Sequence, residues 1–216
     1  MRSISARLRV CVSLALLLTP ALANAQDIGA GSRVHLAAGG GFLTSGTYFT
    51  GPGGAELVNG DAFAGALQVS VAVHRAFAVV LAATHARPTW KLTGVPLLGA
   101  VDVPGARLWF VDAALRGQIP LGAASSSVIF GQAGAGLANY ALTTSLLGTP
   151  VDENATNVAL TLGAGLALPL TRRLGVEVMA KDYIASFKGV RDLAEFGVEG
   201  RRAHTVLLLV SARLGL

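Results

Sequence analysis

The chain has 216 residues, of which 52% are apolar and 13% are charged, about half the charged share of a typical soluble domain. Seventeen Lys and Arg residues against 12 Asp and Glu residues give a formal charge of +5, but three of the arginines precede residue 26. The rest carries 14 basic and 12 acidic side chains, which excludes the strongly basic surface of a nucleic-acid-binding protein. The single cysteine, Cys11, leaves residues 26–216 without disulfides or thiolate metal sites.

Residues 1–25 have the pattern of a cleaved secretory signal peptide. The basic residues at its start are Arg2, Arg7 and Arg9. An apolar run follows at Val10–Leu18, and Ala23-Asn24-Ala25 is a small-x-small cleavage site. Pro20 ends the apolar run well short of the ~20 residues that a helical membrane span needs. We therefore expect export, with residues 26–216 as the mature domain.

Eight segments of the mature region predict β-strands that alternate between the two faces of a sheet. They are Arg33–Leu43, Ala62–His74, Phe77–Trp90, Ala106–Ile119, Ser127–Ala141, Asn157–Leu168, Leu174–Phe187 and Ala203–Leu216. No mature segment has the 18 consecutive apolar residues of a membrane helix. A chain this apolar without such a helix indicates a closed barrel, because only helices and closed barrels satisfy their backbone groups in lipid. The expected fold is all-β, an eight-stranded antiparallel transmembrane up-and-down β-barrel.

The connections between these strands alternate in length. The short ones are Arg75-Ala76, Pro120–Ser126 and Pro169–Arg173. The long ones are Thr44–Asp61, Lys91–Gly105, Leu142–Thr156 and Lys188–Arg202. Outer-membrane barrels have short periplasmic turns and long extracellular loops. We therefore expect a bacterial outer-membrane location with both termini on the periplasmic side.

The last strand shows the expected division into a lipid face and an inner face. Its alternate apolar positions are Val206, Leu208, Val210, Ala212, Leu214 and Leu216. Thr205, Ser211, Arg213 and Gly215 stand between them. For the fifth strand, Ser127–Ala141, the sequence does not decide which positions face lipid.

Together, the export signal, the eight strands, the alternating connections and the terminal strand resemble the small outer-membrane barrels of the opacity-protein and outer-membrane-protein-A-like group. The resemblance extends over the mature chain and is one of pattern. The segment Val206–Leu216 is similar to the signal that the barrel-assembly machinery reads, although the family usually ends in Phe where this chain has Leu216. The resemblance implies that this machinery is a partner during biogenesis.

Aromatic residues near the predicted extracellular strand ends suggest a girdle at the level of the lipid headgroups. They are Phe42, Trp90, Trp109, Tyr140, Tyr183 and Phe187.

Five charged residues are expected inside the barrel: Asp112, Arg116, Glu177, Lys181 and Arg213. Eight strands leave an interior that side chains just fill. Because isolated charges in such a space are costly, we expect a plug of paired charges; a narrow ion path or a catalytic pair is the alternative.

The sequence gives no catalytic, cofactor-binding or metal site. The glycines of Gly131–Gly136 lack dinucleotide-binding spacing, and His35, His74, His85 and His204 are not spaced as ligands of one site. A lipid-modifying enzyme would need a histidine, a serine and an acid at the outer rim. His204 and Glu199 lie there, but Thr205 follows and no serine is suitably placed.

The function that we expect is a non-enzymatic surface role. Long loops on a rigid scaffold are the usual place for binding, and the loop ligand stays unidentified. Basic residues of the fourth loop are expected to contact outer-membrane lipid and lipopolysaccharide: Lys188, Arg191, Arg201 and Arg202. The alternatives are a small channel for ions or apolar solutes and an outer-membrane lipid-modifying enzyme.

Overall fold

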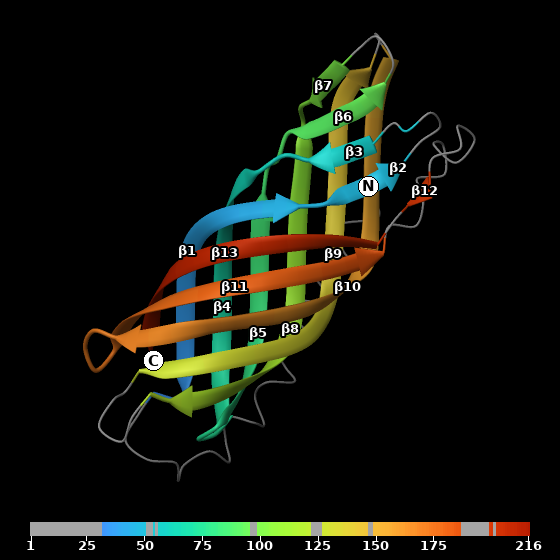
Figure 1. Ribbon diagram of the computed structural model, residues 1–216. Coiled ribbons are helices and arrows are strands. Elements are labelled where there is room, and N and C mark those ends of the chain that lie inside the picture. The colour runs from blue at the N-terminus through green and yellow to red at the C-terminus, as the bar shows by residue number, and fades with distance from the viewer. Residues whose placement is uncertain are drawn as a thin grey trace, which may run out of the picture.

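The computed structural model of the protein describes residues 32–50, 54, 56–95, 99–121, 127–146, 149–186, 199–200 and 202–216 (Figure 1). The predicted signal peptide, residues 1–25, lies outside this part of the chain. Within it the elements are strands, and no helix is long and apolar enough to cross a membrane.

Eight antiparallel strands form a closed barrel, which confirms the expected fold class. In the order of the chain they are β1 (Val34–Ser45), β4 (Ala62–His74), β5 (Phe77–Ala86), β8 (Ala106–Pro120), β9 (Val128–Leu146), β10 (Thr149–Pro169), β11 (Leu174–Ser186) and β13 (Arg202–Gly215). Each pairs with the next one along the chain, and β13 pairs with β1 to close the barrel. The closing register runs from His35 opposite Gly215 to Ser45 opposite Thr205.

Five further strands form a second sheet beyond one end of the barrel (Figure 1). They are β2 (Thr47–Thr50), β3 (Glu56–Asn59), β6 (Trp90–Val95), β7 (Gly99–Val103) and β12 (Glu199–Gly200), in the order β12-β2-β3-β6-β7. They come from the first, second and fourth of the long connections. These connections therefore fold together, where the sequence pattern indicated only separate loops.

Two predicted strand boundaries need correction. The third barrel strand ends at Ala86 instead of Trp90, and Arg87, Pro88 and Thr89 then lead into β6. Proline cannot donate to a β-ladder, which accounts for a break at this point. The third long connection, Leu142–Thr156, is mostly strand: β9 and β10 stay paired out to Leu146 and Thr149.

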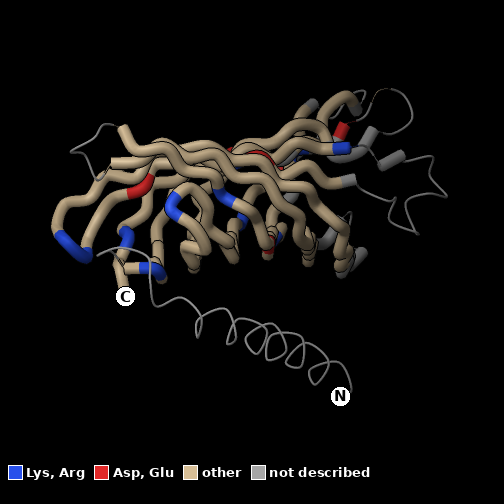
Figure 2. Tube along the Cα trace, turned by 90° about the horizontal axis from the view of Figure 1, so that it is seen from below, with Lys and Arg blue, Asp and Glu red and all other residues tan. Residues whose placement is uncertain are grey.

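Side chains alternate strictly between an apolar outer wall and a filled interior. On β4, Phe63, Leu67 and Val73 are exposed on the outer wall, while Gln68 and Ser70 are buried inside. Figure 2 shows that most of the trace carries no charged residue.

The structure also decides the face of the fifth barrel strand, β9. Ile129 and Leu137 are exposed on the outer wall, and Phe130 and Gln132 are buried inside. Even-numbered residues of β9 therefore face the interior.

Candidate functional site

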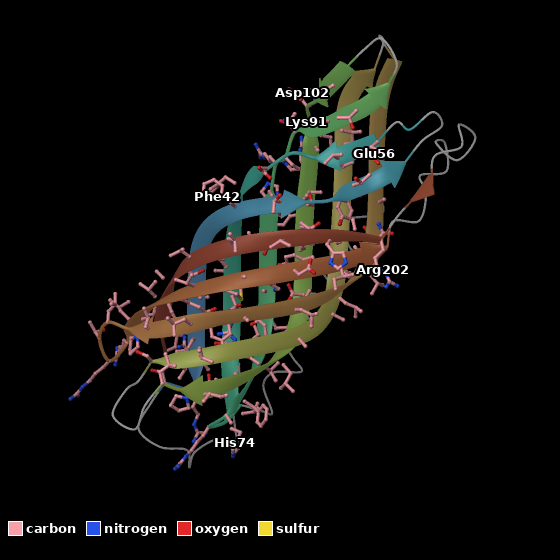
Figure 3. The ribbon with its side chains drawn as sticks, viewed as in Figure 1. Phe42, Glu56, His74, Lys91, Asp102 and Arg202 are labelled. Carbon is pink, nitrogen blue, oxygen red and sulfur yellow. The ribbon has the colours of Figure 1, made fainter. Side chains whose placement is uncertain are left out.

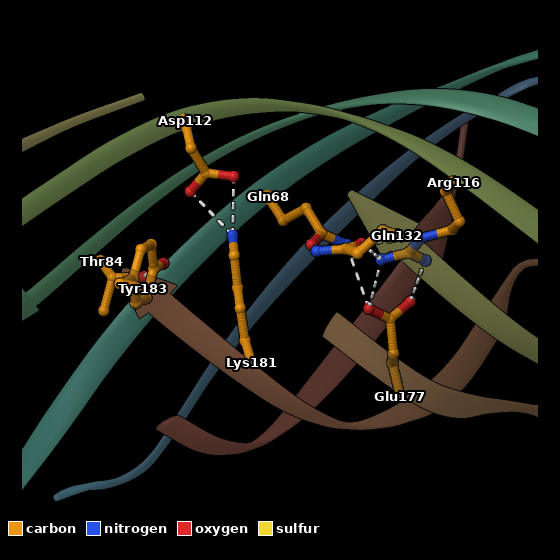
Figure 4. A network of polar contacts seen from close by, with 8 residues as sticks. All are labelled: Gln68, Thr84, Asp112, Arg116, Gln132, Glu177, Lys181 and Tyr183. Carbon is orange, nitrogen blue, oxygen red and sulfur yellow. Dashed lines mark hydrogen bonds and ion pairs between the residues drawn. The ribbon is translucent and has the colours of Figure 1, made fainter. Parts of the chain in front are cut away.

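The interior of the barrel contains a forked ion pair between Arg116 of β8 and Glu177 of β11 (Figure 4). Arg116 Nη1 donates to Glu177 Oε2 at 2.8 Å, and Nη2 donates to Oε1 at 2.9 Å. Gln132 Oε1 accepts from Arg116 Nε at 3.1 Å and from Nη2 at 2.9 Å. Gln68 Nε2 donates to Glu177 Oε1 at 3.1 Å. These amides supply the extra hydrogen bonds that a buried ion pair needs in order to offset its lost hydration.

A second buried pair lies closer to the second sheet. Lys181 Nζ donates to both carboxylate oxygens of Asp112, each at 2.7 Å (Figure 4). Both side chains are 1% exposed, so the pair is shielded from water. Asp112 lies four residues from Arg116 along β8, and Lys181 lies four residues from Glu177 along β11. The two pairs thus form adjacent layers across the same strands.

Arg213, the fifth charge expected in the interior, is half-buried on β13. No ion pair joins it within the described residues, and its Nε has no hydrogen-bond partner there. Of the five charged residues expected as a plug of paired charges, four thus form two compensated pairs, and Arg213 has no ion-pair partner among the described residues.

An apolar and aromatic layer fills the barrel beyond Lys181. The rings of Phe110 and Tyr183 stack with centroids 4.2 Å apart, and Tyr140 meets Phe110 edge-on at 6.1 Å. The Tyr183 hydroxyl is 2.9 Å from Thr84 Oγ1. Buried leucines complete this layer: Leu43, Leu108 and Leu207. No open path is expected through a layer packed in this way.

Phe130 packs below the first ion pair. The Arg116 guanidinium carbon lies 3.8 Å from the centroid of its ring, a cation–π contact. The same ring covers Gly165 of β10, where a Cβ would approach Phe130 Cζ to 2.5 Å. A Cβ there would also clash with the backbone oxygen of Val178, so a larger residue at Gly165 would have to shift β11 as well as Phe130.

This filled interior predicts little steady ion conductance. The refolded protein in planar bilayers should show no stable single-channel currents at moderate voltage. The variant Phe110→Ala/Tyr183→Ala, which removes two stacked rings, should conduct measurably, and Phe130→Leu serves as a control that keeps apolar volume. Large stable currents from the unmodified protein would contradict a closed interior and favour the channel alternative.

Three residues of the expected aromatic girdle are buried instead, which corrects that expectation. Tyr140 and Tyr183 share the parity of Gln132 and Glu177 on their strands and therefore face the interior, at 4% and 1% exposure. Trp90 is 6% exposed, because the chain leaves the barrel at Ala86 and Trp90 begins β6 of the second sheet.

The other three residues expected in the girdle are Phe42, Trp109 and Phe187. Phe42 is 69% exposed on the outer wall (Figure 3), and Trp109 is 46% exposed there. The His85 ring stacks on Trp109 with centroids 4.2 Å apart, and Phe42 meets Phe63 edge-on. Phe187 lies outside the described residues. That Phe42 and Trp109 mark the headgroup level stays a prediction.

The terminal strand places its six alternate apolar residues on the outer wall, between β1 and β11. Leu208, Val210 and Leu216 are each more than half exposed. The inner face is less polar than the sequence pattern indicated, because Leu207 and Leu209 are buried there. Recognition of this strand by an assembly machinery stays a prediction.

Of the basic residues in the fourth loop, Arg202 is described and is exposed at the start of β13 (Figure 3). Lys188, Arg191 and Arg201 lie outside the described residues. The acid next to His204 is Asp182 of β11, with Oδ2 2.7 Å from His204 Nδ1. Glu199 is the acid that its closeness in sequence suggested. Its backbone lies opposite Thr50 in the β-ladder of the second sheet.

Sequence reasoning missed Gln68, Gln132 and Asp182 as parts of polar clusters. The parity of β9 was undecided, so Gln132 could not be placed inside. Among the described residues, no group of three or more His, Asp or Glu side chains is arranged to hold a metal ion.

Comparison with known proteins identifies the fold. No family model matches the chain, and no curated protein matches it in sequence. Among solved structures, Neisserial surface protein A (NspA) is 12% identical, with 87% of this chain and all of that chain covered and a TM-score of 0.59. The outer membrane protein OprG from Pseudomonas aeruginosa is 13% identical, with 88% of this chain and all of that chain covered and a TM-score of 0.57.

At such low identity these likenesses concern the fold alone, and they agree with the strand number and closure described above. The chain has the fold of the small eight-stranded outer-membrane β-barrels.

Proposed function

We propose that this protein is exported by the signal at residues 1–25, is inserted into the bacterial outer membrane by the barrel-assembly machinery, and acts at the cell surface by binding. The structural likeness to outer-membrane proteins and the apolar outer wall support the location. In this orientation the short links and the end of β13 are periplasmic, and the second sheet is extracellular.

The second sheet is the observation that carries the proposal. A hairpin needs only two to five connecting residues. Here three long connections combine into five paired strands, and β9 and β10 continue as a ladder to Leu146 and Thr149. This ordered structure stands on a barrel whose interior is filled. Because the extracellular part is ordered and the interior of the barrel is filled, a binding function is favoured over transport.

The surface closest to the membrane is proposed to contact lipopolysaccharide. Arg202 is exposed where β13 meets the second sheet, and the fourth loop adds Lys188, Arg191 and Arg201 in sequence. Cationic side chains form charge-assisted hydrogen bonds with phosphate, which lipopolysaccharide carries near the membrane surface.

Shortening the fourth loop tests this function. Replacing residues 188–198 with a short Gly/Ser link should leave the barrel intact, because β12 is an edge strand joined to β2 by only two residue pairs. The variant should keep its heat-dependent gel migration but bind lipopolysaccharide vesicles more weakly. The loss should shrink as salt rises, since exposed charges are screened beyond about 8 Å at physiological ionic strength.

A full-length control separates charge from loop length. Lys188→Gln/Arg191→Gln/Arg201→Gln keeps the loop and should reproduce most of the loss. Equal binding by the protein and both variants at low and moderate salt would contradict the proposed role of this loop.

A further inference from the structure

The outer wall contains one ionisable pair in a position where the surroundings are otherwise apolar. Asp182 points outward from β11 and pairs with His204 of β13 at 2.7 Å. Its neighbours on the same face of β11 are Ala180 and Ile184, and its cross-strand partners are Leu162 and Val206. A carboxylate facing hydrocarbon is costly, and such residues usually serve a function.

The pair leaves hydrogen-bonding capacity unused. A carboxylate only accepts, so His204 Nδ1 must carry the proton that it shares with Asp182 Oδ2. Asp182 Oδ1 is buried and has no hydrogen-bond partner among the described residues. The His204 side chain is 58% exposed, so the opposite edge of its ring, with Nε2, is accessible from the membrane side. The ring nitrogen Nε2 is thus available to a molecule lying against the wall, whereas Asp182 Oδ1 is covered by the protein.

Arg202 adds a cation to the same face. It stands two residues before His204 on β13, toward the second sheet, and is exposed (Figure 3). When His204 is protonated, the charges of Asp182 and His204 cancel and that of Arg202 remains. The cluster therefore complements an anion at the level where the barrel meets the second sheet.

A groove on the outer wall begins at Asp182 and Val206. It has a volume of about 570 Å³, within the range of small-molecule sites. Small residues form its floor across β9, β10 and β11: Gly131, Ala133, Ala164 and Ala180. Leu115 and Leu162 rise beside them. Gln132, Lys181 and Asp182 also border the groove, but its other lining residues are apolar or glycine, which suits an acyl chain.

We propose that this cluster and groove bind one molecule of a phosphorylated, acylated glycolipid, the lipid A part of lipopolysaccharide. Its phosphate oxygens accept from Arg202 and from the protonated Nε2 of His204, and one acyl chain lies in the groove. A phosphate on the head group is what this cluster can bind. The extracellular end of the barrel lies in the leaflet that contains this lipid. This orientation is part of the proposed function, and the inference rests on it.

The test measures binding of purified diphosphorylated lipid A to the folded full-length mature chain in detergent, by native mass spectrometry with titration. Hydrogen bonds to charged groups contribute enough that each lost contact should weaken binding about tenfold. We expect this for Arg202→Gln, and also for Asp182→Asn, which removes the carboxylate that holds His204 in place. Arg107→Gln removes another exposed, outward-facing arginine, from β8, and should change binding less than about twofold.

The groove is tested independently of the charges. Ala180→Leu fills it and should weaken binding, whereas Ala38→Leu places the same side chain on the outer wall of β1, which contributes no residue to the groove. These variants stay apolar toward lipid and should fold like the unmodified chain. They keep the test decisive even if Asp182→Asn fails to fold.

The lipid probes identify the occupant. Equal affinity for dephosphorylated lipid A would overturn the phosphate contact, and equal affinity for phosphatidylglycerol would overturn the assignment to a glycolipid. Identical binding by all variants would mean ordinary boundary lipid only. The shortened-loop variant retains Asp182, Arg202 and His204, so it should still bind purified lipid A even if the loop itself contributes nothing.

Discussion

Replacing Glu177 with alanine is expected to lower the free energy of unfolding by about 3–5 kcal/mol, because it leaves the Arg116 guanidinium buried without its counterion. The forked pair at 2.8 and 2.9 Å is 2–3% exposed, so water cannot take over the role of the carboxylate. Unfolding in denaturant, followed by tryptophan fluorescence and by the gel shift of unboiled samples, measures the change.

Two controls distinguish an unpaired charge from lost packing. Ser211→Ala removes a buried hydroxyl on β13, directly opposite Glu177 in the β-ladder, and should cost far less. The double variant Arg116→Leu/Glu177→Leu removes both charges and should recover most of the stability, since apolar replacement of a buried pair is often neutral. A double variant as unstable as Glu177→Ala would contradict this account.

An arginine at Leu67 is expected to destabilise the barrel in the membrane by about 2–4 kcal/mol, the cost of a cation on the lipid face near the midplane. Leu67 is half exposed at the middle of β4, between Ala38 of β1 and Ala83 of β5. Equilibrium folding into lipid vesicles with denaturant measures the difference.

The matched control is a position on the same face of β4 but closer to the membrane interface. Val73 lies on the same face of the same strand, next to the turn at Arg75 and Ala76. Val73→Arg should cost only about 0–1 kcal/mol, because an arginine near the interface reaches water. Equal costs at the two positions would mean that the outer wall does not face hydrocarbon.

The barrel strands could be predicted from sequence because a period of two is imposed on each strand by its two environments. Asn157–Leu168 follows this rule throughout, and Val206–Leu216 follows it except at Leu207 and Leu209, which are apolar but buried inside. It weakens where small residues fill both faces, as in the fifth strand, where Gly131, Ala133 and Ala135 gave no contrast with Gly134 and Gly136. There the neighbouring strands decide the face, and a single segment does not contain that information.

The same rule, applied consistently, would have placed Tyr183 correctly. Its parity matches Glu177 and Lys181, but its nearness to a strand end suggested the membrane interface. Parity decides orientation because backbone pairing fixes it, whereas the preference of tyrosine for the interface is only a tendency.

The remaining errors concern partners distant in the chain. The second sheet requires connections separated by many residues to meet, as when Gly200 pairs with Phe49. Asp182 and His204 come together only through the register of β11 with β13. Neither of these contacts is indicated by the local sequence around its residues.

The pairing of β1 with β13 also determines when the barrel can close. His35 of β1 pairs with Gly215 of β13, so the β1–β13 ladder has the largest sequence separation in the barrel. Until β13 arrives, β1 and β11 each expose a row of unpaired backbone groups, which hydrocarbon does not tolerate. A partly synthesised chain can therefore form hairpins but cannot enter the bilayer as a stable wall. Insertion and closure must occur together, and an assembly factor that pairs transiently with both open edges would remove the main barrier to them.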